Sequence, residues 1–153
     1  MFVLKLSNWG VIRSKACKRT WHDWHVSSHA FLACAVLLAC IHHVYELAVL
    51  SALVVVCSVA YHRRREKPGM IADVDRLMAR TLFAYSVLQV FYAPRRSLLA
   101  FELCCAVLTV GIWVATRQWV HLNEFWHPVG LHVIPGVWAS VVACTHASLV
   151  KLF

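Results

Sequence analysis

The sequence has few of the residues with which a soluble domain faces water and turns its chain. Only 14% of its 153 residues are charged, with five Gly and four Pro, whereas soluble domains carry about 25% charged residues. So little Gly and Pro excludes a collagen-like chain, and 61% apolar residues excludes disorder. A soluble fold of this length still exposes roughly 30% of its unfolded surface, so it cannot hide so many apolar side chains. The composition predicts a polytopic membrane protein.

Acidic residues and metal-binding cysteine motifs are also scarce. Asp and Glu number seven against fifteen Lys and Arg, and the net charge is +8. No C-x-x-C occurs among the seven cysteines, which lie almost wholly in apolar segments, so we interpret them as small hydrophobic residues. The basic residues cluster beside apolar segments and do not alternate with aromatic residues. We therefore expect anionic lipids as partners and no nucleic acid.

Apolar runs predict one all-α domain over residues 1–153, a membrane helix bundle of about five transmembrane helices. The bundle is expected over 27–150, after a basic juxtamembrane segment at 1–26. One helix over 30–61 would be about 48 Å long, beyond a hydrocarbon core of roughly 30 Å. We therefore expect two helices there, and a kink at Pro135-Gly136 in the last helix. The expected helices cover 27–43, 46–62, 73–93, 98–116 and 128–150.

The basic residues also predict how the bundle is oriented. The first 22 residues carry five basic residues and no acidic one, which is typical of a mitochondrial targeting segment and of a cytoplasmic or matrix-side flank. With five helices, ten Lys and Arg flank the bundle on the side of the N-terminus and three on the other side. We expect a multi-pass membrane protein with this terminus on the cytoplasmic or matrix side, and the inner mitochondrial membrane is a candidate location.

Side chains suited to metal chemistry gather at the ends of three expected helices, which lie on one side of the membrane in a five-helix topology. Three imidazoles that hold zinc and leave a fourth position for water make a catalytic site, in which a carboxylate accepts the proton of that water. The candidates are Ser58 and His62 at the end of the second helix, Asp73 and Asp75 at the start of the third, and His127 and His132 at the start of the fifth.

Ser58-x-x-x-His62, with Asp73 at the following helix start and His127 at the last helix, resembles the motifs of a membrane hydrolase superfamily. This superfamily contains the alkaline ceramidases and the progestin/adipoQ receptors, has seven spans, and holds zinc with three His beside a Ser and an Asp. The resemblance implies that His62 is a zinc ligand and Ser58 its neighbour. It implies that Asp73 is the acid, with Asp75 as the alternative.

The last helix departs from the superfamily, whose corresponding motif is H-x-x-x-H. Asn123 stands four residues before His127, where the first His would be, and His132 follows His127 by five residues. Five residues cover about 140° around an α-helix. We therefore expect one ligand of this pair to be lost or misplaced.

Two further groups of histidines have alternative interpretations. His25 and His29 are four residues apart, a spacing that suits a metal site on a helix, but we favour an amphipathic entry to the first helix. His146 with His42 or His43 would provide axial ligands for a b-type haem. We favour hydrogen bonding of these histidines to a neighbouring helix.

Charged residues inside the expected helices complete the candidates. Glu102 is an acid within the fourth helix, and an intramembrane acid is a candidate functional residue. We favour a structural ion pair with a nearby arginine over proton transport. Arg76 and Arg80 lie one turn apart and are expected to pair with Asp73 and Asp75 or with anionic headgroups.

Two functions follow from these observations. The first, which we favour, is a non-catalytic accessory subunit of a larger membrane complex, such as a mitochondrial respiratory or ATP synthase assembly, with other membrane subunits as partners and no cofactor. The second is a zinc-dependent lipid amide hydrolase, similar to a ceramidase and of reduced size. Convergence of His62, His127 and His132 at zinc-binding distances would favour the second.

Overall fold

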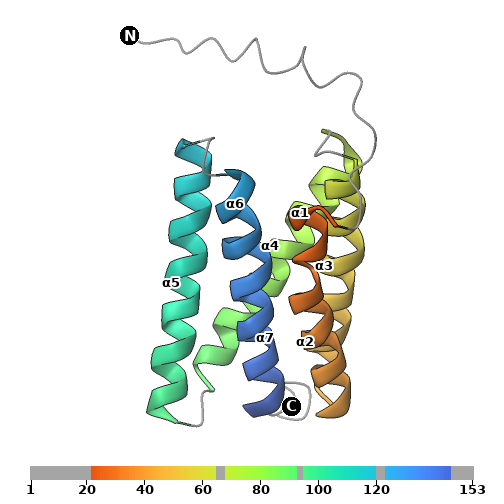
Figure 1. Cartoon of the computed structure of the whole chain (residues 1–153). Helices are drawn as coiled ribbons and strands as arrows, with labels where there is room; N and C mark the ends of the chain where they lie inside the picture. The colour runs from red at the N-terminus through yellow and green to blue at the C-terminus, as the bar shows by residue number, and fades with distance from the viewer. Residues whose placement is uncertain (1–21, 65–67, 93–94, 120–122, 146–153) are drawn as a thin grey trace.

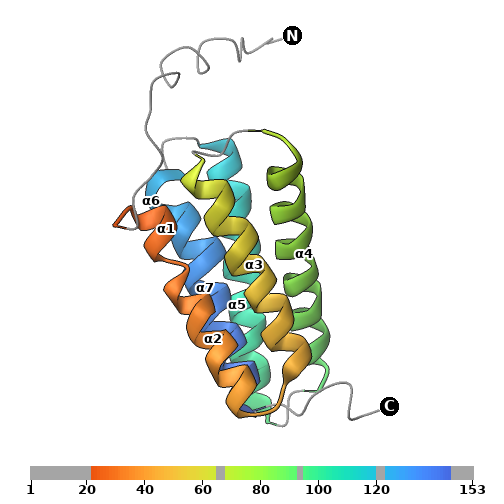
Figure 2. The same ribbon diagram turned by 90° about the vertical axis from the view of Figure 1, so that its right-hand side faces the viewer.

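Five helical rods make up the protein in a computed structural model that describes residues 22–64, 68–92, 95–119 and 123–145. The rods lie side by side with no strand among the described residues, which confirms the predicted all-α bundle (Figures 1 and 2). The first rod contains α1 (Trp24–Ser27) and α2 (Ala30–Ile41), the next three are α3 (Tyr45–Arg63), α4 (Met70–Val90) and α5 (Arg96–Gln118), and the last contains α6 (Asn123–Pro128), η2 (Val129–Val133) and α7 (Ile134–Thr145).

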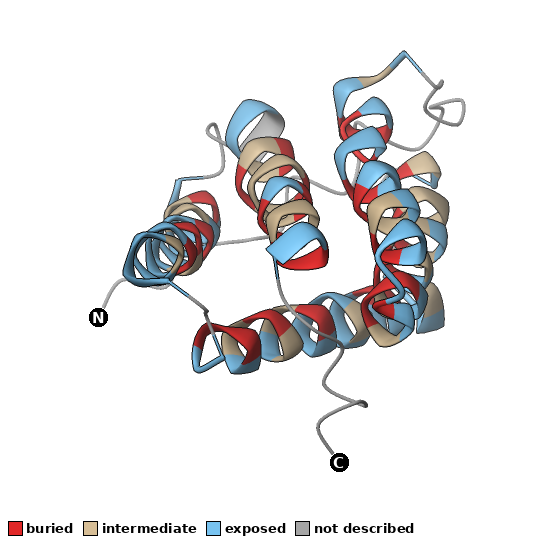
Figure 3. Cartoon of the chain, turned by 90° about the horizontal axis from the view of Figure 1, so that it is seen from below, coloured by how far each residue is buried: buried red, intermediate tan, exposed pale blue. Residues whose placement is uncertain are grey.

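Four of the rods are long and apolar enough to cross a membrane: Trp24–Ile41, Tyr45–Arg63, Arg96–Gln118 and Phe125–Thr145. Buried residues face the neighbouring rods and exposed ones face outward (Figure 3). Many of these outward side chains are large and apolar, among them Leu37, Val56 and Val107, as expected for a surface in contact with lipid. The coarse prediction of a membrane helix bundle is confirmed.

The remaining rod, α4, is too polar in its first turns to count as a span by composition. It nevertheless runs the length of the bundle, because α3 ends and α5 begins at opposite ends (Figure 1). α4 crosses the bundle diagonally in this view (Figure 1) and packs against α3, where Tyr85 in the second half of α4 donates to Glu46 Oε1 at 3.2 Å.

The turn between α2 and α3 forms without Gly or Pro. His43 takes the left-handed conformation at φ 61°, and its amide donates to Cys40 O at 3.2 Å. The Val44 amide donates to Ala39 O at 2.8 Å, which completes the Schellman pattern of a helix C-terminus. Val44 is fully buried and anchors the turn. The predicted division of this stretch into two helices is confirmed.

α2 and α7 pack against each other in the core. A Cβ atom at Gly136 would lie 2.7 Å from the carbonyl carbon of Phe31 and 2.8 Å from the amide nitrogen of Leu32, so only glycine permits this approach. Trp138 on α7 and Leu32 on α2 are almost completely buried beside it. The contact holds the first and last rods together.

The last rod differs from the prediction in its start and in the place of its irregular segment. It begins at Asn123, five residues before Pro128, and its irregular turn is the π-helical stretch Val129–Val133. The Ile134 amide donates to Val129 O, five residues back, whereas Pro135 lies within α7. The prediction of a kink at Pro135-Gly136 is therefore wrong about the position, and residues 146–150 of the predicted helix lie outside the described residues.

Candidate metal centre

Five histidines gather at one end of the bundle, where α1 begins, α3 ends and the last rod begins (Figure 1). The ring centroids of neighbouring pairs lie 3.9 to 6.0 Å apart. Four of the rings are buried and the fifth, His127, is half-buried. A neutral imidazole has one hydrogen-bond donor and one acceptor, and burying either nitrogen without a hydrogen-bond partner costs free energy. We call this group the histidine cluster; it comprises His25, His29, His62, His127 and His132.

Three members of the cluster lie close enough together to bind one metal ion. Ligand atoms of His29, His62 and His132 all lie within 4.8 Å of one another. Three nitrogens on a tetrahedral zinc, each 2.0–2.1 Å from the ion, are about 3.3 Å apart. The rings therefore need to approach by at most about 1.5 Å, a movement within the range of small side-chain rotations.

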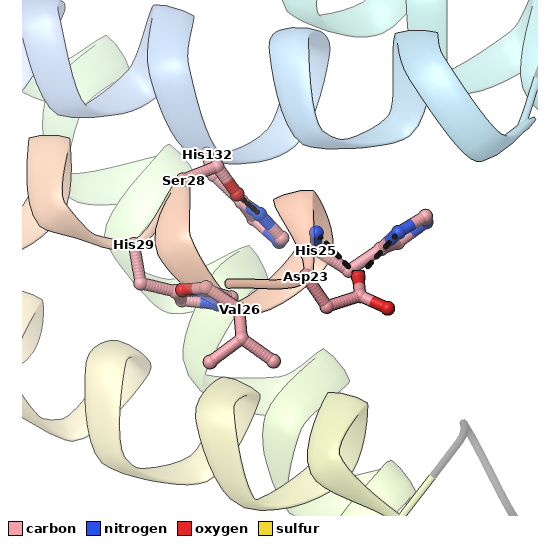
Figure 4. Close-up of polar contacts among 6 residues, drawn as sticks. All are labelled: Asp23, His25, Val26, Ser28, His29 and His132. Atoms are coloured by element: carbon pink, nitrogen blue, oxygen red, sulfur yellow. Dashed lines mark hydrogen bonds and ion pairs between the residues drawn. The ribbon is translucent and has the colours of Figure 1, made fainter. Parts of the chain in front are cut away.

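The backbone break between α1 and α2 orients His29. Its Nδ1 lies 3.1 Å from Val26 O, so Nδ1 carries the proton and donates it to that carbonyl (Figure 4). The opposite nitrogen, Nε2, is buried and has no hydrogen-bond partner. Metal-binding histidines commonly use this arrangement, in which one ring nitrogen donates to a carbonyl and the other binds the ion.

A hydrogen bond between the first and last rods orients His132. Ser28 Oγ lies 2.7 Å from His132 Nδ1 (Figure 4), which leaves Nε2 as the ring nitrogen available to a metal. His132 lies in the π-helical stretch, where hydrogen bonds join residues five apart. Residues at this spacing come onto one face there, so the rings of His127 and His132 lie 5.5 Å apart. The two rings thus lie close together although His127 itself belongs to α6, yet His127 is not a member of the trio, in line with the expectation that one ligand of this pair is misplaced.

Asp23 positions a fourth histidine beside this trio. Its Oδ1 caps α1 by accepting the backbone amide of His25 at 3.0 Å and lies 3.4 Å from His25 Nδ1 (Figure 4). The His25 ring lies 5.6 Å from the His62 ring and 6.0 Å from the His127 ring. His25 and His127 therefore border the trio without joining it.

A cavity of about 490 Å³ opens beside the histidine cluster between α3, α4, α5 and the last rod. Ser58 and His62 line it from α3, and Asp75 lines it from α4. All three are buried, and Ser58 precedes His62 by one turn on the same helix face. Asp73, in contrast, has a side chain that is 74% exposed and bonds Arg76 at 3.2 Å. The structure thus places Asp75, the alternative acid, beside the cluster.

Searches with the chain find no matching family model, no similar curated protein and no similar solved structure. The resemblance to the ceramidase superfamily therefore depends on the site residues alone. Of the three predicted ligands, His62 and His132 belong to the trio, and His29 takes the third place instead of His127. His29 was singled out only with His25, because no spacing along the chain connects it to the other two.

Two other sequence-based hypotheses involve residues away from the cluster. His42 and His43 lie at the opposite end of α2, where His43 Nδ1 is 2.7 Å from Tyr45 Oη, and His146, their proposed haem partner, lies outside the described residues. Glu102 of α5 is fully buried, and its pairing with an arginine stays a prediction. The predicted pairing of Arg76 with Asp73 is present.

Proposed function

We propose that this protein is a zinc-dependent hydrolase that cleaves an amide bond of a membrane lipid. One observation carries the proposal: His29, His62 and His132 bring their ligand atoms within 4.8 Å of one another, and two of them, His62 and His132, line a cavity that Ser58 and Asp75 also line. Three nitrogen ligands with an open fourth position are the ligand set of a catalytic zinc site. The bare Nε2 of His29 supports a metal over a simple hydrogen-bonded cluster.

The chain's own residues would divide the work of hydrolysis. His29, His62 and His132 would hold the zinc, which would supply Lewis acidity and a coordinated water with a pKa of about 7. The Asp75 carboxylate, on the cavity wall, accepts the proton of the attacking water and returns it to the leaving amine. The Ser58 hydroxyl, one turn from His62, donates a hydrogen bond to the carbonyl oxygen as negative charge develops there.

The shape and lining of the cavity support a lipid as the substrate. Its volume of about 490 Å³ falls in the range of about 300–1,000 Å³ for small-molecule sites. It lies within a bundle of membrane-spanning helices, and much of its wall is apolar. The apolar wall accommodates an acyl chain and excludes bulk water from the reacting groups. The apolar wall includes Leu32, Val54, Leu82, Phe83, Leu131 and Trp138.

The deciding experiment measures metal content and hydrolysis on the same purified protein. We expect close to one zinc per chain by elemental mass spectrometry and release of fatty acid from a fluorescent N-acyl sphingoid lipid. His62→Ala should lose both. His42→Ala, at the exposed far end of α2, is the matched control and should keep both. A wild-type protein without zinc, or hydrolysis unaffected by His62→Ala, would refute the proposal.

The accessory-subunit hypothesis stays a prediction, and so does its mitochondrial location. It predicts that the chain, solubilised gently from its native membrane, co-migrates with a large complex and contains no zinc. Metal analysis of the gel band that contains the chain therefore distinguishes the two functions. A hydrolase predicts a small zinc-loaded species.

A further inference from the structure

We propose that the cavity recognises a lipid whose headgroup carries an anionic phosphate, bound by Arg80 and Arg117; this rests on the proposed lipid hydrolase and names its substrate class. Both arginines line the same cavity as His62, Asp75 and Ser58. They come from different rods, Arg80 from α4 and Arg117 from the last turn of α5. The cavity therefore combines a metal-binding wall, an apolar wall and two guanidinium groups.

Arg80 is available to a ligand. Within the part of the chain that the structure describes, it makes no ion pair, whereas Arg76, one turn earlier, bonds Asp73 at 3.2 Å. Arg76 and Arg80 both line the cavity from α4. Asp73 thus neutralises Arg76 and leaves Arg80 as the unneutralised charge of this helix face.

Arg117 is held in place by an aromatic ring. Its guanidinium carbon lies 4.8 Å above the centroid of Trp113, one turn earlier on α5, a cation–π contact. Trp113 lines the cavity together with Arg117. Stacking orients the planar guanidinium and leaves its N–H donors free to bind phosphate oxygens in pairs.

The position of the two arginines favours a lipid headgroup over a soluble anion. Arg117 lies in the last turn of α5, at the end of the bundle where α4 begins (Figure 1) and where a phosphate of the membrane interface would lie. Arg80 lies at the middle of α4, and its long side chain leans toward the start of that helix and so toward the same end. Below them the cavity wall is apolar, with Leu82, Val110 and Trp138, and fits the acyl chain of the same molecule. Among the described residues that line the cavity, Asp75 is the one carboxylate, and the proposed mechanism assigns it to the attacking water.

The test measures lipid binding without turnover. Protein treated with EDTA is examined by native mass spectrometry in detergent with phosphatidic acid, which carries the phosphate but no amide bond to hydrolyse. It is examined separately with diacylglycerol of the same acyl chains, which has no phosphate. We expect the wild-type protein to bind phosphatidic acid at least tenfold more tightly. Arg80→Gln/Arg117→Gln should reduce this ratio to about one, and Arg80→Lys/Arg117→Lys should keep part of it. Arg95→Gln/Arg96→Gln, with the same change in charge at the far end of α5, is the matched control and should leave the ratio unchanged.

Competition distinguishes the two sources of phosphate. Inorganic phosphate and glycerol 3-phosphate should compete at least a hundredfold more weakly than phosphatidic acid. Equal binding of the two lipids by the wild-type protein, equal loss in both double variants, or equally strong competition by inorganic phosphate would each overturn the proposal. If the double glutamine variant does not fold, Arg80→Gln and Arg117→Gln are measured singly.

The outcome is independent of the hydrolase proposal. Selective binding without hydrolysis by zinc-loaded protein leaves the headgroup site in place and refutes the enzyme. Hydrolysis without a headgroup preference refutes the headgroup site and leaves the hydrolase proposal in place.

Discussion

Ser28 Oγ and His132 Nδ1 form a 2.7 Å hydrogen bond across 104 residues of sequence, and this bond joins the two irregular segments of the bundle. Ser28 lies in the break between α1 and α2, and His132 lies in the π-helical stretch of the last rod. Each irregularity presents one histidine of the candidate trio, His29 or His132, to the other. Backbone irregularity of this kind recurs at functional sites in helices.

Ser28→Ala should weaken metal binding while the ligands stay in place. The substitution leaves His132 Nδ1 buried without its partner, which costs about 1–3 kcal/mol, and removes the group that fixes the ring. Loss of such an outer contact typically lowers metal affinity about 10- to 100-fold. Competition with a zinc chelator measures the change. Ser27→Ala, one residue away and exposed, is the control, and an equal effect in both variants would contradict the prediction.

Asp75→Asn and Asp73→Asn should separate the two aspartates of α4. Under the proposed mechanism Asp75→Asn removes the proton acceptor, and general-base removal costs about 10²- to 10⁴-fold in rate, with zinc content unchanged. Asp73→Asn disrupts an exposed pair with Arg76 and should stay within about twofold of the wild-type rate, because exposed ion pairs contribute little. Rates of fatty-acid release at saturating lipid provide the measurement. If Asp73→Asn were the more damaging, the assignment of the base would be reversed.

Gly136→Ala should destabilise the bundle by separating α2 from α7. Its new methyl group would lie 2.7 Å from backbone carbon of Phe31, which backbone movement must relieve at a cost of about 1–3 kcal/mol. Gly111→Ala is the control, since a Cβ there meets nothing within 4 Å, and it should be neutral or stabilising by up to about 1 kcal/mol. Thermal unfolding in detergent, followed by circular dichroism, compares them. Equal melting temperatures for both variants would show that the close approach is not limiting.

His43→Val should be less stable than His43→Gly because residue 43 has φ 61°. A left-handed conformation costs a residue with a Cβ roughly 1–2 kcal/mol, and glycine avoids this cost. Both variants lose the bond to Tyr45 Oη, so their difference isolates the backbone effect. The same unfolding assay measures it, and a more stable valine variant would argue against the left-handed turn.

Hydropathy predicted the rods and their approximate ends, and charge counting predicted which ends lie together. Hydropathy and charge are both read from short stretches of sequence. A bilayer constrains both of them, because it requires apolar spans of a set length and charged flanks. The candidate site was predicted in part, because His62 and Asp75 lie at helix ends that topology brings together. Ser28 and His29 were not connected to that site, since their partners lie far away along the chain.

The π-helical stretch was also beyond sequence reasoning. It lies where Gly130 allows the side chain of Ile112 on α5 to occupy the space of a Cβ atom, and where Pro135 lacks the N–H that would donate to a carbonyl one turn back. Neither feature can be recognised from residue spacing, yet the π-helical stretch sets the direction of the His132 side chain.

The polarity of α4 has a consequence for how the protein enters its membrane. Each charged residue at the centre of a span opposes insertion by about 2.5–3.5 kcal/mol, and the first half of α4 carries Asp73, Asp75, Arg76 and Arg80. Asp73, Asp75 and Arg76 lie toward one end of the helix, where the cost is smaller, but Arg80 lies at its centre. We therefore expect α4 to insert poorly on its own. Its partner α3, against which it packs, is apolar enough to insert independently. We therefore expect α4 to enter the bilayer together with α3, as a packed pair of helices.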